Sequence, residues 1–418
     1  VFRDGFGCTQ LPIEAEASRA DWLARKSGWP RADGLDRSSA LGADVSISMP
    51  VEVQSRLEAP ISFAFDGQTY GDGTRTSAVV ILHRGEVVGE RYARGIGPET
   101  PQRTWSVAKS ITATLLGAAH AQGLIGPQSS ALLEAWRNGS DPRREITLAN
   151  LLHMSSGLYA GDQGARTDAV YFGGARVVDE STTGSLIQAP GSTFHYANND
   201  TLIALRALRE AIGDDAAYHA FPYTEVLWKI GARRTILETD WNGDFVASSQ
   251  VWSTARDLAR IGQLYVQNGR WGGEQILSPD WARFVRTPAP AQPQNVPYGY
   301  GAQFWLLGGV EGLPDDTFAA MGHRGQYLVI VPSRDLVVVR RGYDVSGGTR
   351  FDIAAFTRDA ITAVDRGLQA KAYAQAVASA LESGRAERQS DGTVVFLDED
   401  GNPTDPPVPP PGGAPRAQ

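Results

Sequence analysis

Ser106 and Lys109 are three positions apart at the start of a predicted helix, and together they could generate a nucleophile. Residues 107–122 carry apolar side chains at helical spacing and precede Gly123, which predicts a helix that begins just after the serine. Side chains three apart share one helix face, with Cβ atoms about 5–6 Å apart. A lysine amine removed from water could then accept the serine proton. Serine is common, however, so such a pair also arises by chance and is not specific alone.

A second stretch that could join this pair in a cleft carries Tyr196 and Asn198. A Pro-Gly turn at 190–191 precedes them, and a predicted helix follows. A buried phenol held near cations can act as a base or a proton relay, and the asparagine supplies an amide donor. The same pattern also suits a core aromatic residue followed by a helix N-cap. Further aromatic residues could line a pocket, although packing in the core or in a loop is their more common role: Tyr159, Tyr171 and Tyr218.

A third stretch, 322–326, has the sequence Gly-His-Arg-Gly-Gln and enters a predicted strand. Its two glycines permit close approach of the backbone to a ligand. The backbone N–H of Gln326 would then point into the cleft. The alternative is a bulge at the start of a strand, with His323 and Arg324 in solvent.

The periodicity of apolar residues predicts strands at both ends of the chain and a helical block between them. Two apolar runs, 77–82 and 87–92, flank a glycine turn and predict a hairpin. Further strands are expected at 298–307, 317–321, 327–331 and 336–340. Helices are expected at 14–26, 147–152, 200–212, 254–267 and 353–368, the last with room to continue to 380. Strands from distant segments must share one sheet, so the predicted fold class is α+β: an antiparallel sheet flanked by helices, with an inserted, mostly helical domain without strands.

This layout divides the chain into four regions. Residues 1–75 form an irregular lead-in that wraps the main body. Residues 76–123 and 251–370 form the α/β domain, and residues 124–250 form the helical insertion. Residues 371–418 extend the last helix and end in a proline-rich tail that is not expected to form a core.

The composition excludes several classes of function. The chain has 418 residues, of which 42% are hydrophobic and 21% charged, as is typical of a globular protein. A net charge of −8 argues against a role in binding nucleic acid. The single cysteine, Cys8, excludes an internal disulfide, and the histidines lack metal-ligand spacing, so no metal is expected. The sequence contains no phosphate-binding loop and no apolar run of membrane-spanning length, so neither a cofactor nor an integral membrane segment is expected.

The three motifs occur in the order found in serine β-lactamases and penicillin-binding proteins: Ser106-x-x-Lys109, then Tyr196-x-Asn198, then a glycine-flanked basic triplet before a strand pair. The surrounding sequence resembles the branch that contains class C β-lactamases, related esterases and 6-aminohexanoate-dimer hydrolases. Segments typical of that branch are found at 151–158, 254–262 and 269–278. The resemblance covers residues 75–365 and implies a β-lactamase/transpeptidase-like fold.

The resemblance also implies a role for each matching residue. Ser106 would be the acylated nucleophile and Lys109 its general base. Tyr196 would carry the proton to the leaving group and later activate water, and Asn198 would contact the substrate. With Lys109 and a protonated His323 near one phenol, the pKa of Tyr196 is expected to be lowered.

The triplet His323, Arg324 and Gly325 departs from the Lys-Thr-Gly or His-Thr-Gly of the superfamily. In members that process β-lactams, the lysine and threonine hold the substrate carboxylate, so their loss favours an esterase or an amidase. Arg324 could still bind a carboxylate bidentately. The backbone N–H groups of Ser106 and Gln326 would form the oxyanion hole.

The sequence therefore predicts a metal-free serine hydrolase that acts through a covalent acyl-enzyme on small esters or amides. The first alternative is a D,D-peptidase, D-aminopeptidase or β-lactamase acting on cell-wall-type substrates. The second is a non-catalytic relative that binds peptides, which a fluorophosphonate or penicillin probe would not label. No nucleic-acid partner is expected, and the chain is expected to be a monomer or a homodimer. The first residue is Val1 rather than methionine, which fits a removed signal peptide and a truncated chain equally well. The family resemblance favours a periplasmic or secreted protein, with a cytoplasmic location as the alternative.

Overall fold

The structure is a computed structural model that describes residues 1–3, 6–12, 15–16, 51–160 and 167–408. At its centre lies a seven-stranded antiparallel sheet in the order β10-β11-β12-β13-β14-β3-β4. The strands are β3 (Thr76–His83), β4 (Glu86–Tyr92), β10 (Gly299–Tyr300), β11 (Trp305–Leu306), β12 (Phe318–Gly322), β13 (Gln326–Val331) and β14 (Leu336–Gly342). β14 pairs with β3, so the two ends of the chain share one sheet. This arrangement confirms the predicted α+β class.

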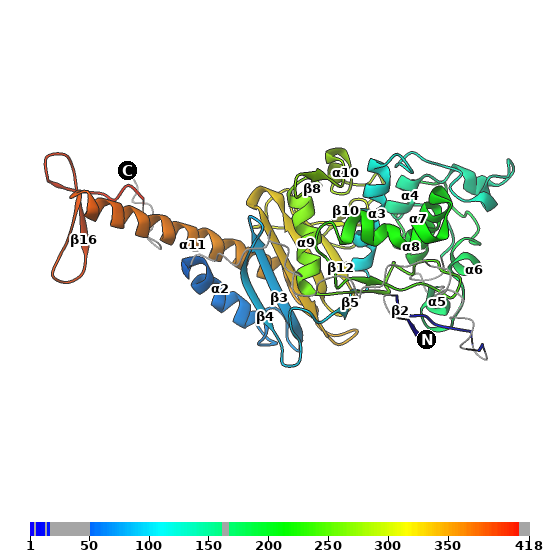
Figure 1. Ribbon diagram of the computed structural model, residues 1–418, viewed down its shortest axis with the longest axis horizontal. Helices are drawn as coiled ribbons and strands as arrows, with labels where there is room; N and C mark the ends of the chain where they lie inside the picture. Colours follow the sequence, from blue (N-terminus) through cyan, green and yellow to red (C-terminus); the bar gives the residue numbers. More distant parts are fainter. Residues whose placement is uncertain (4–5, 13–14, 17–50, 161–166, 409–418) are drawn as a thin grey trace.

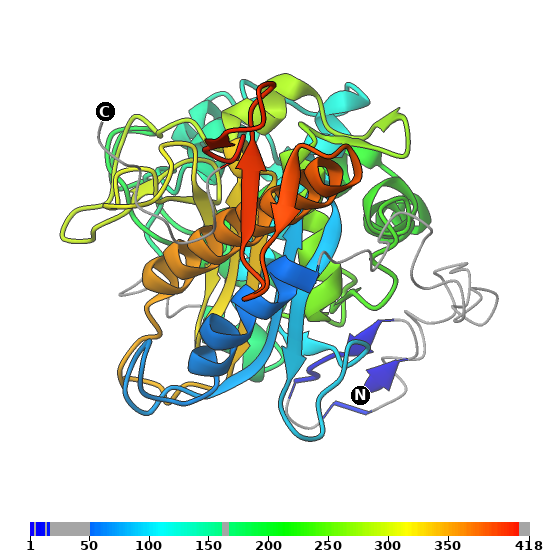
Figure 2. The ribbon, with the colours of Figure 1, turned by 90° about the vertical axis from the view of Figure 1, so that its left-hand side faces the viewer.

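Each face of the sheet is covered by helices, as Figures 1 and 2 show: α2 (Val51–Ala64) and α11 (Ile353–Glu382) on one side, α3 (Val107–Ala121) and α9 (Ala255–Val266) on the other. Alternate residues of a strand point to opposite faces. In β3, Val79 and Ile81 pack toward α2 and α11, while Val80 and Leu82 pack toward α3 and α9. Both faces are therefore buried, which explains why these strands read as continuous apolar runs.

The segment between α3 and α9 is mostly helical. Its α-helices are α4 (Leu148–Leu152), α5 (Asp168–Phe172), α6 (Val177–Ser181), α7 (Asn198–Ile212) and α8 (Asp215–Phe221). A π-helix covers Pro222–Leu227, and short 3₁₀ turns cover Glu134–Trp136 and Pro142–Glu145. The prediction of no strands here is wrong, because β6 (Ile236–Leu237) pairs with β7 (Val251–Ser253), which also pairs with β5 (Gln102–Arg103). A two-residue strand is too short to produce a readable alternation.

Capping residues fix several helix boundaries where the sequence places them. The side chain of Thr147 accepts from the backbone N–H of Asn150 in a capping box, and Thr254 caps α9 in a similar way. Gly213 ends α7 with φ +72°, a left-handed conformation that suits glycine. α7 begins at Asn198, two residues before the predicted start.

The expected strand 298–307 is wrong, because β10 and β11 form a tight hairpin within it. The backbone N–H of Gly301 donates to Phe304 O (2.9 Å), and Gln303 adopts φ +64°. The Gln303 side chain then links three elements: it donates to the carbonyls of Leu151 and Leu152 and accepts from Thr201. A buried glutamine with these partners bends a segment whose composition reads as a strand.

α2 was not predicted, although its buried residues Val53, Leu57, Ile61 and Ala64 follow helical spacing. The prolines at 50 and 60 hid the pattern, since Pro60 lies inside the helix. The helix expected at 14–26 lies outside the described residues except for 15–16. β1 (Phe2–Arg3) and β2 (Gly7–Cys8) form a small ribbon near the N-terminus.

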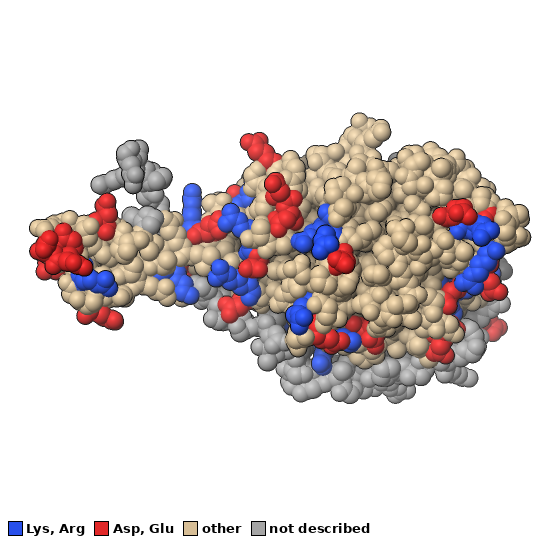
Figure 3. Space-filling view, turned by 90° about the horizontal axis from the view of Figure 1, so that it is seen from above, with Lys and Arg blue, Asp and Glu red and all other residues tan. Residues whose placement is uncertain are grey.

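The outer part of α11 projects from the body, and Figure 3 shows this narrow projection with acidic side chains gathered at its tip. A three-stranded sheet, β15 (Ala386–Arg388), β16 (Val394–Leu397) and β17 (Pro403–Thr404), follows the helix. Phe396 and Ala386 pack against Ala380 of α11 in a small core. The prediction that the tail forms no core is therefore wrong for its described residues, which extend to 408. The remaining elements are β8 (Arg270–Trp271), β9 (Glu274–Gln275), α10 (Pro279–Phe284) and a 3₁₀ turn, Pro332–Arg334.

Candidate active site

The motifs meet at a cavity of about 500 Å³ between the sheet and the helical region. Ser106 at the start of α3 and Tyr196 just before α7 lie in its wall. Gly322, His323, Arg324 and Gly325, which join β12 to β13, complete the same wall. Residues from three distant stretches of sequence are thus brought to one cavity.

Ser106 is held where a strained turn becomes a helix. The residue before it, Trp105, has φ +49°, which is unusual for a side chain of this size. The backbone N–H of Thr104 donates to Val251 O (2.8 Å), which fixes the turn to β7. Ser106 itself has helical φ and ψ and places its side chain in the cavity wall at the N-terminus of α3.

The Lys109 amine is buried and has three oxygen neighbours. Nζ lies 3.1 Å from Ser106 Oγ, 2.6 Å from Asn198 Oδ1 and 2.9 Å from Ser248 O. The last two oxygens belong to carbonyl groups, which only accept hydrogen bonds. A neutral amine has two hydrogens and one lone pair, so these carbonyls take both hydrogens. The lone pair then faces Ser106 Oγ, which is the geometry a base needs.

Burial also favours the neutral form of the Lys109 amine, which this geometry requires. All three partners of Lys109 are neutral oxygens, and only 1% of the residue is exposed. Desolvation of the ammonium lowers the pKa of Lys109 to about 7. A large share of molecules therefore carries a neutral amine near neutral pH, ready to accept the Ser106 proton.

Tyr196 lies beside Ser106 and Lys109, but its pKa is shifted in the direction opposite to the one expected. Its hydroxyl hydrogen-bonds Ser106, yet burial dominates and raises the pKa of Tyr196 to about 12. The expected lowering is wrong for a physical reason. Lys109 Nζ lies 5.1 Å from the ring centroid but is readily neutral. Burial and nearby arginines lower the pKa of His323, so neither expected cation is firmly charged. Tyr196 is thus a proton donor in the resting site.

The loop that carries the 151–158 motif positions this tyrosine. The backbone N–H of His195 donates to Met154 O (2.7 Å), and that of Ala197 donates to Met154 Sδ (3.3 Å). Ser156 Oγ donates to Asp200 Oδ1 (2.7 Å). Residues on both sides of Tyr196 are therefore tied to one loop, which gives the motif a structural role.

Aromatic packing fixes the ring of Tyr196 from the other side. The Trp305 ring stacks on it at 5.7 Å, and the Tyr300 ring meets its edge at 6.1 Å. Both partners come from the β10–β11 hairpin. The departure from the predicted single strand is therefore what brings two aromatic side chains to the site.

Asn198 is placed differently from the role that the resemblance implies. Its Oδ1 accepts from Lys109, and its Nδ2 donates to Thr167 Oγ1 (2.9 Å). Both ends of the amide are thus engaged within the protein. The geometry favours a role for Asn198 in orienting the lysine; its contact with substrate stays a prediction.

The basic triplet forms the turn between β12 and β13, rather than a bulge at the start of a strand. Arg324 and Gly325 have φ +60° and +76°. Gly322 pairs with Gln326, and a Cβ on Gly322 would lie 3.2 Å from Ser106 N and 2.4 Å from Thr104 O. Glycine thus lets the hairpin approach Ser106 closely. The backbone amides of Ser106 and Gln326 flank this contact, and the oxyanion hole they would form stays a prediction.

No sequence pattern indicated two buried residues of the site: Thr167, which contacts Asn198, and Ser248, which contacts Lys109. Thr167 is the N-cap residue of α5 and Ser248 lies in a turn before β7, and both carry common polar side chains without a motif. Tyr171 was expected to pack in the core or a loop, and it is buried with its hydroxyl 2.5 Å from Ser248 Oγ.

Within the described part of the chain, no helix is long and apolar enough to cross a membrane.

Known proteins resemble this chain in sequence and in fold. Over 316 residues, 70% of this chain and 78% of the relative, the chain is 24% identical to the 6-aminohexanoate-dimer hydrolase of Paenarthrobacter ureafaciens. The structure matches that of a proposed 6-aminohexanoate-dimer hydrolase from Bacillus anthracis (23% identity, 70% and 80% of the chains, TM-score 0.59). It also matches EstCE1, a hydrolase with promiscuous acyltransferase activity (16% identity, 75% and 98%, TM-score 0.58). These structural likenesses establish the shared fold.

The family assignment rests on the profile of the β-lactamase family, which matches residues 64–341. This range includes all three motifs and every strand of the central sheet. It also covers the cavity wall from Ser106 to Gly325. The chain belongs to the β-lactamase family.

Proposed function

We propose that this protein is a serine hydrolase that cleaves small esters or amides through a covalent acyl-enzyme. The observation that carries the proposal is the pairing of Ser106 Oγ with the buried amine of Lys109 at 3.1 Å, with burial lowering the lysine pKa to about 7. This is the arrangement by which a weak alcohol becomes a nucleophile at neutral pH.

The acylation step follows from the positions of the groups. Ser106 Oγ attacks the substrate carbonyl as its proton passes to Lys109 Nζ. The oxyanion is stabilised by the amides of Ser106 and Gln326. Tyr196 then protonates the leaving alcohol or amine, and Lys109 returns a proton to the phenolate. Water attacks the acyl-enzyme by the same groups in reverse, which releases the acid and restores the Ser106 hydroxyl.

The substrate we favour carries a free carboxylate. Arg103, Arg324 and Arg350 all lie close enough to His323 to lower its pKa. The cavity also contains a carboxylate, Asp344, but Arg340 neutralises it through two hydrogen bonds of 2.8 Å each. Arg324 and Arg350 therefore give the edge of the cavity a net positive charge, and we call this edge the cationic rim. Apolar side chains line the rest of the cavity and suit a short aliphatic chain: Tyr298, Trp305, Met321, Tyr327 and Val345.

Covalent trapping tests the reaction class. A fluorophosphonate probe should add one label per chain, and the label should map to the peptide that contains Ser106. The Ser106→Ala variant should take none, while p-nitrophenyl butyrate turnover should identify the esterase activity. A label on another residue, or a folded protein that neither labels nor turns over any ester, would move the non-catalytic alternative to the front.

Arg324 should control selectivity for acid-ended substrates. Its Nε donates to Asp344 O (3.0 Å), which holds the guanidinium at the cavity wall. Arg324→Gln should raise KM for the linear 6-aminohexanoate dimer by about tenfold, the effect of one charge-assisted hydrogen bond in a half-exposed site. KM for the methyl ester of the dimer should stay unchanged. Arg270→Gln, at an exposed arginine bonded to Gly273 O, is the control. Equal changes in KM for both substrates would contradict the proposal that Arg324 binds the substrate carboxylate.

The cationic rim also suits peptides that end in a free D-alanine, so a D,D-peptidase is the second candidate. The two functions differ in which part of the substrate must fit the apolar wall. Parallel assays of the 6-aminohexanoate dimer, an acylated D-Ala-D-Ala peptide and a chromogenic cephalosporin distinguish them. Fast turnover of the peptide or the cephalosporin would replace the first candidate with the second.

A further inference from the structure

We propose that Thr167, Tyr171 and Ser248 are positioning residues that fix the orientation of the Asn198 amide and, through it, direct the Lys109 lone pair at Ser106. The inference rests on the proposed acyl-enzyme function, in which Lys109 is the base. It concerns residues that lie outside the family motifs and are not among those that line the cavity.

The three residues and Asn198 form a closed circuit of hydrogen bonds around the lysine. Asn198 Nδ2 donates to Thr167 Oγ1 (2.9 Å), and Thr167 hydrogen-bonds the Tyr171 hydroxyl. Tyr171 in turn lies 2.5 Å from Ser248 Oγ. Ser248 closes the circuit, because its carbonyl oxygen accepts from Lys109 Nζ (2.9 Å).

The polarity of this circuit matters because an amide has one acceptor end and one donor end. A threonine hydroxyl can donate as well as accept. When the Thr167 hydrogen goes to the Tyr171 oxygen, Thr167 only accepts from Nδ2, and Oδ1 then faces Lys109, where it takes an amine hydrogen. If the amide turned over, its NH₂ group would face Lys109 instead. The amine would then use its lone pair to accept from Asn198, and Ser106 would lose its base. A single hydroxyl therefore decides which way the lysine points.

Burial makes the orientation costly to lose. Thr167 and Ser248 are fully buried, and Tyr171 is 6% exposed. A buried donor without a partner costs about 1–3 kcal/mol. Water cannot readily replace the threonine hydroxyl at such a site, so loss of that hydroxyl leaves the Asn198 amide with an unpaired buried end.

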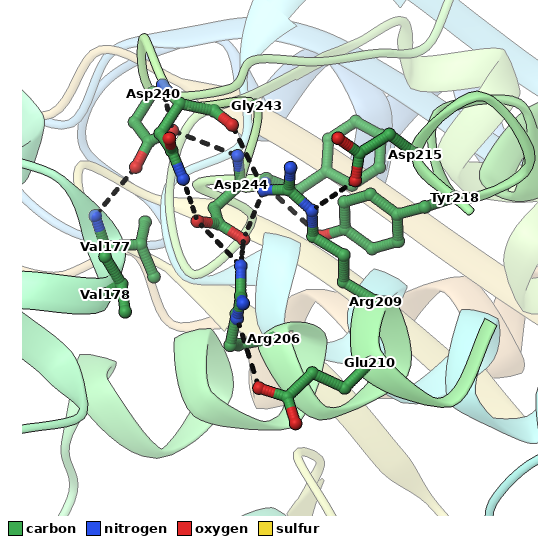
Figure 4. A network of polar contacts seen from close by, with 12 residues as sticks. Val177, Val178, Arg206, Arg209, Glu210, Asp215, Tyr218, Asp240, Gly243 and Asp244 are labelled. Atoms are coloured by element: carbon green, nitrogen blue, oxygen red, sulfur yellow. Dashed lines mark hydrogen bonds and ion pairs between the residues drawn. The ribbon is translucent and has the colours of Figure 1, made fainter. Parts of the chain in front are cut away.

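The elements that carry the circuit are themselves tied together, as Figure 4 shows. Arg206 and Arg209 of α7 each pair with Asp244, with Nη1–Oδ1 distances of 3.1 and 2.9 Å. Asp240 accepts from the backbone N–H of Val177 at the start of α6 (2.7 Å) and from that of Asp244 (3.0 Å). The helix that begins with Asn198 is thereby locked to the segment that leads to Ser248.

The test replaces Thr167 with valine, which has the same shape but cannot accept a hydrogen bond. Thr167→Val should lower kcat for p-nitrophenyl butyrate by about 10–100-fold, with KM unchanged, because the base rather than the binding surface is altered. Thr167→Ser, which keeps the hydroxyl, should retain wild-type kcat. Thermal unfolding of both variants checks that they fold.

A second readout does not depend on turnover. The chain has four lysines, at 26, 109, 229 and 371, so ¹³Cε-lysine NMR can follow each one, with Lys109→Met providing the assignment. In Thr167→Val the Lys109 titration should move to lower pH by about one unit, because the ammonium loses a carbonyl partner. This measurement stands even if the wild type hydrolyses none of the esters tried, so failure of the proposed function is distinguishable.

The outcomes separate a positioning role from a purely structural one. A Thr167→Val variant with a lower Tm but unchanged kcat and unchanged Lys109 titration would overturn the proposal. Equal losses of kcat in the serine and valine variants would also overturn it, because the hydroxyl would then not be the cause. A loss confined to valine, with the shifted lysine titration, is the result we expect.

Discussion

Replacement of Lys109 by methionine is expected to lower kcat for ester hydrolysis by about 10²–10⁴-fold, the range that a positioned general base contributes. Methionine has a similar length and fills the same buried space, but it cannot accept the Ser106 proton. KM should change little, because Lys109 is buried behind the nucleophile and bonds only protein oxygens. Steady-state kinetics on p-nitrophenyl butyrate measure both constants.

The pH profile of the wild type should report the same residue. Lys109 acts as a base only when neutral, and burial lowers its pKa to about 7. Activity should therefore be low below pH 7 and rise as the pH passes through about 7. Burial and nearby arginines lower the pKa of His323, so His323 should contribute less than Lys109 to this rise. The activity of the Lys109→Met variant should not show this rise with pH, which forms the acidic limb of the pH profile.

A matched control distinguishes loss of the general base from a general effect of removing a lysine. Lys229 forms ion pairs with Glu225 (3.2 Å) and Glu274 (2.8 Å) far from Ser106 in sequence, and these raise its pKa. Lys229→Met should keep both kcat and the pH limb. The double variant Ser106→Ala with Lys109→Met should be no less active than Ser106→Ala alone, since the two residues act as a unit. A Lys109→Met enzyme with the wild-type pH profile would exclude Lys109 as the base.

Local signals explain which parts of the fold could be predicted. The hairpin of β3 and β4, the meander of β12 to β14 and the caps Thr147 and Thr254 all depend on residues within about fifteen positions of one another. Ser106 and Lys109 belong to the same class, because a helix sets their spacing without help from other segments. The pairing of β14 with β3 followed from having strands at both ends of the chain.

Long-range contacts explain what could not be predicted. The break between β10 and β11 depends on Gln303, whose partners lie about 100 to 150 positions away in α4 and α7. Thr167 and Ser248 become significant only because folding brings both to the Lys109–Asn198 pair. No spacing rule applies to residues that meet in this way. A polar side chain in a loop reads the same in sequence whether it is solvated or buried.

The error over Tyr196 has the same origin. The sequence indicated which cations stand near the phenol, but it could not indicate how deeply each group is buried. Burial raises the pKa of Tyr196 and lowers that of Lys109, so desolvation outweighs their mutual attraction. The proton is therefore expected to start on Tyr196 and the lone pair on Lys109, the reverse of a phenolate beside an ammonium.

Arg341 is a buried residue that joins the strand leading to Ser106 to the hairpin that carries Gln326. It lies on β14 with no exposed surface, and all of its acceptors are neutral oxygens. Its Nε donates to Gln326 Oε1 (2.7 Å), and its Nη groups donate to Ser253 O (2.6 Å), Gln102 O (2.8 Å) and Arg103 O (3.0 Å). Burial lowers its pKa to about 9, which still leaves it charged at neutral pH. One side chain thus connects β13, β7 and β5.

Arg341→Met should lower the free energy of unfolding by about 3–5 kcal/mol, because it leaves buried acceptors without a donor on three strands. Urea denaturation measures this change, with Arg334→Met as the control. Arg334 is exposed and pairs only with Asp365 (3.2 Å), so its loss should cost less than about 1 kcal/mol. Because Arg341 fixes β5 and Gln326 on either side of Ser106, folded Arg341→Met should also lose kcat more than KM. A change in unfolding free energy no larger than that of the control would show that the contact among β5, β7 and β13 depends on backbone pairing alone.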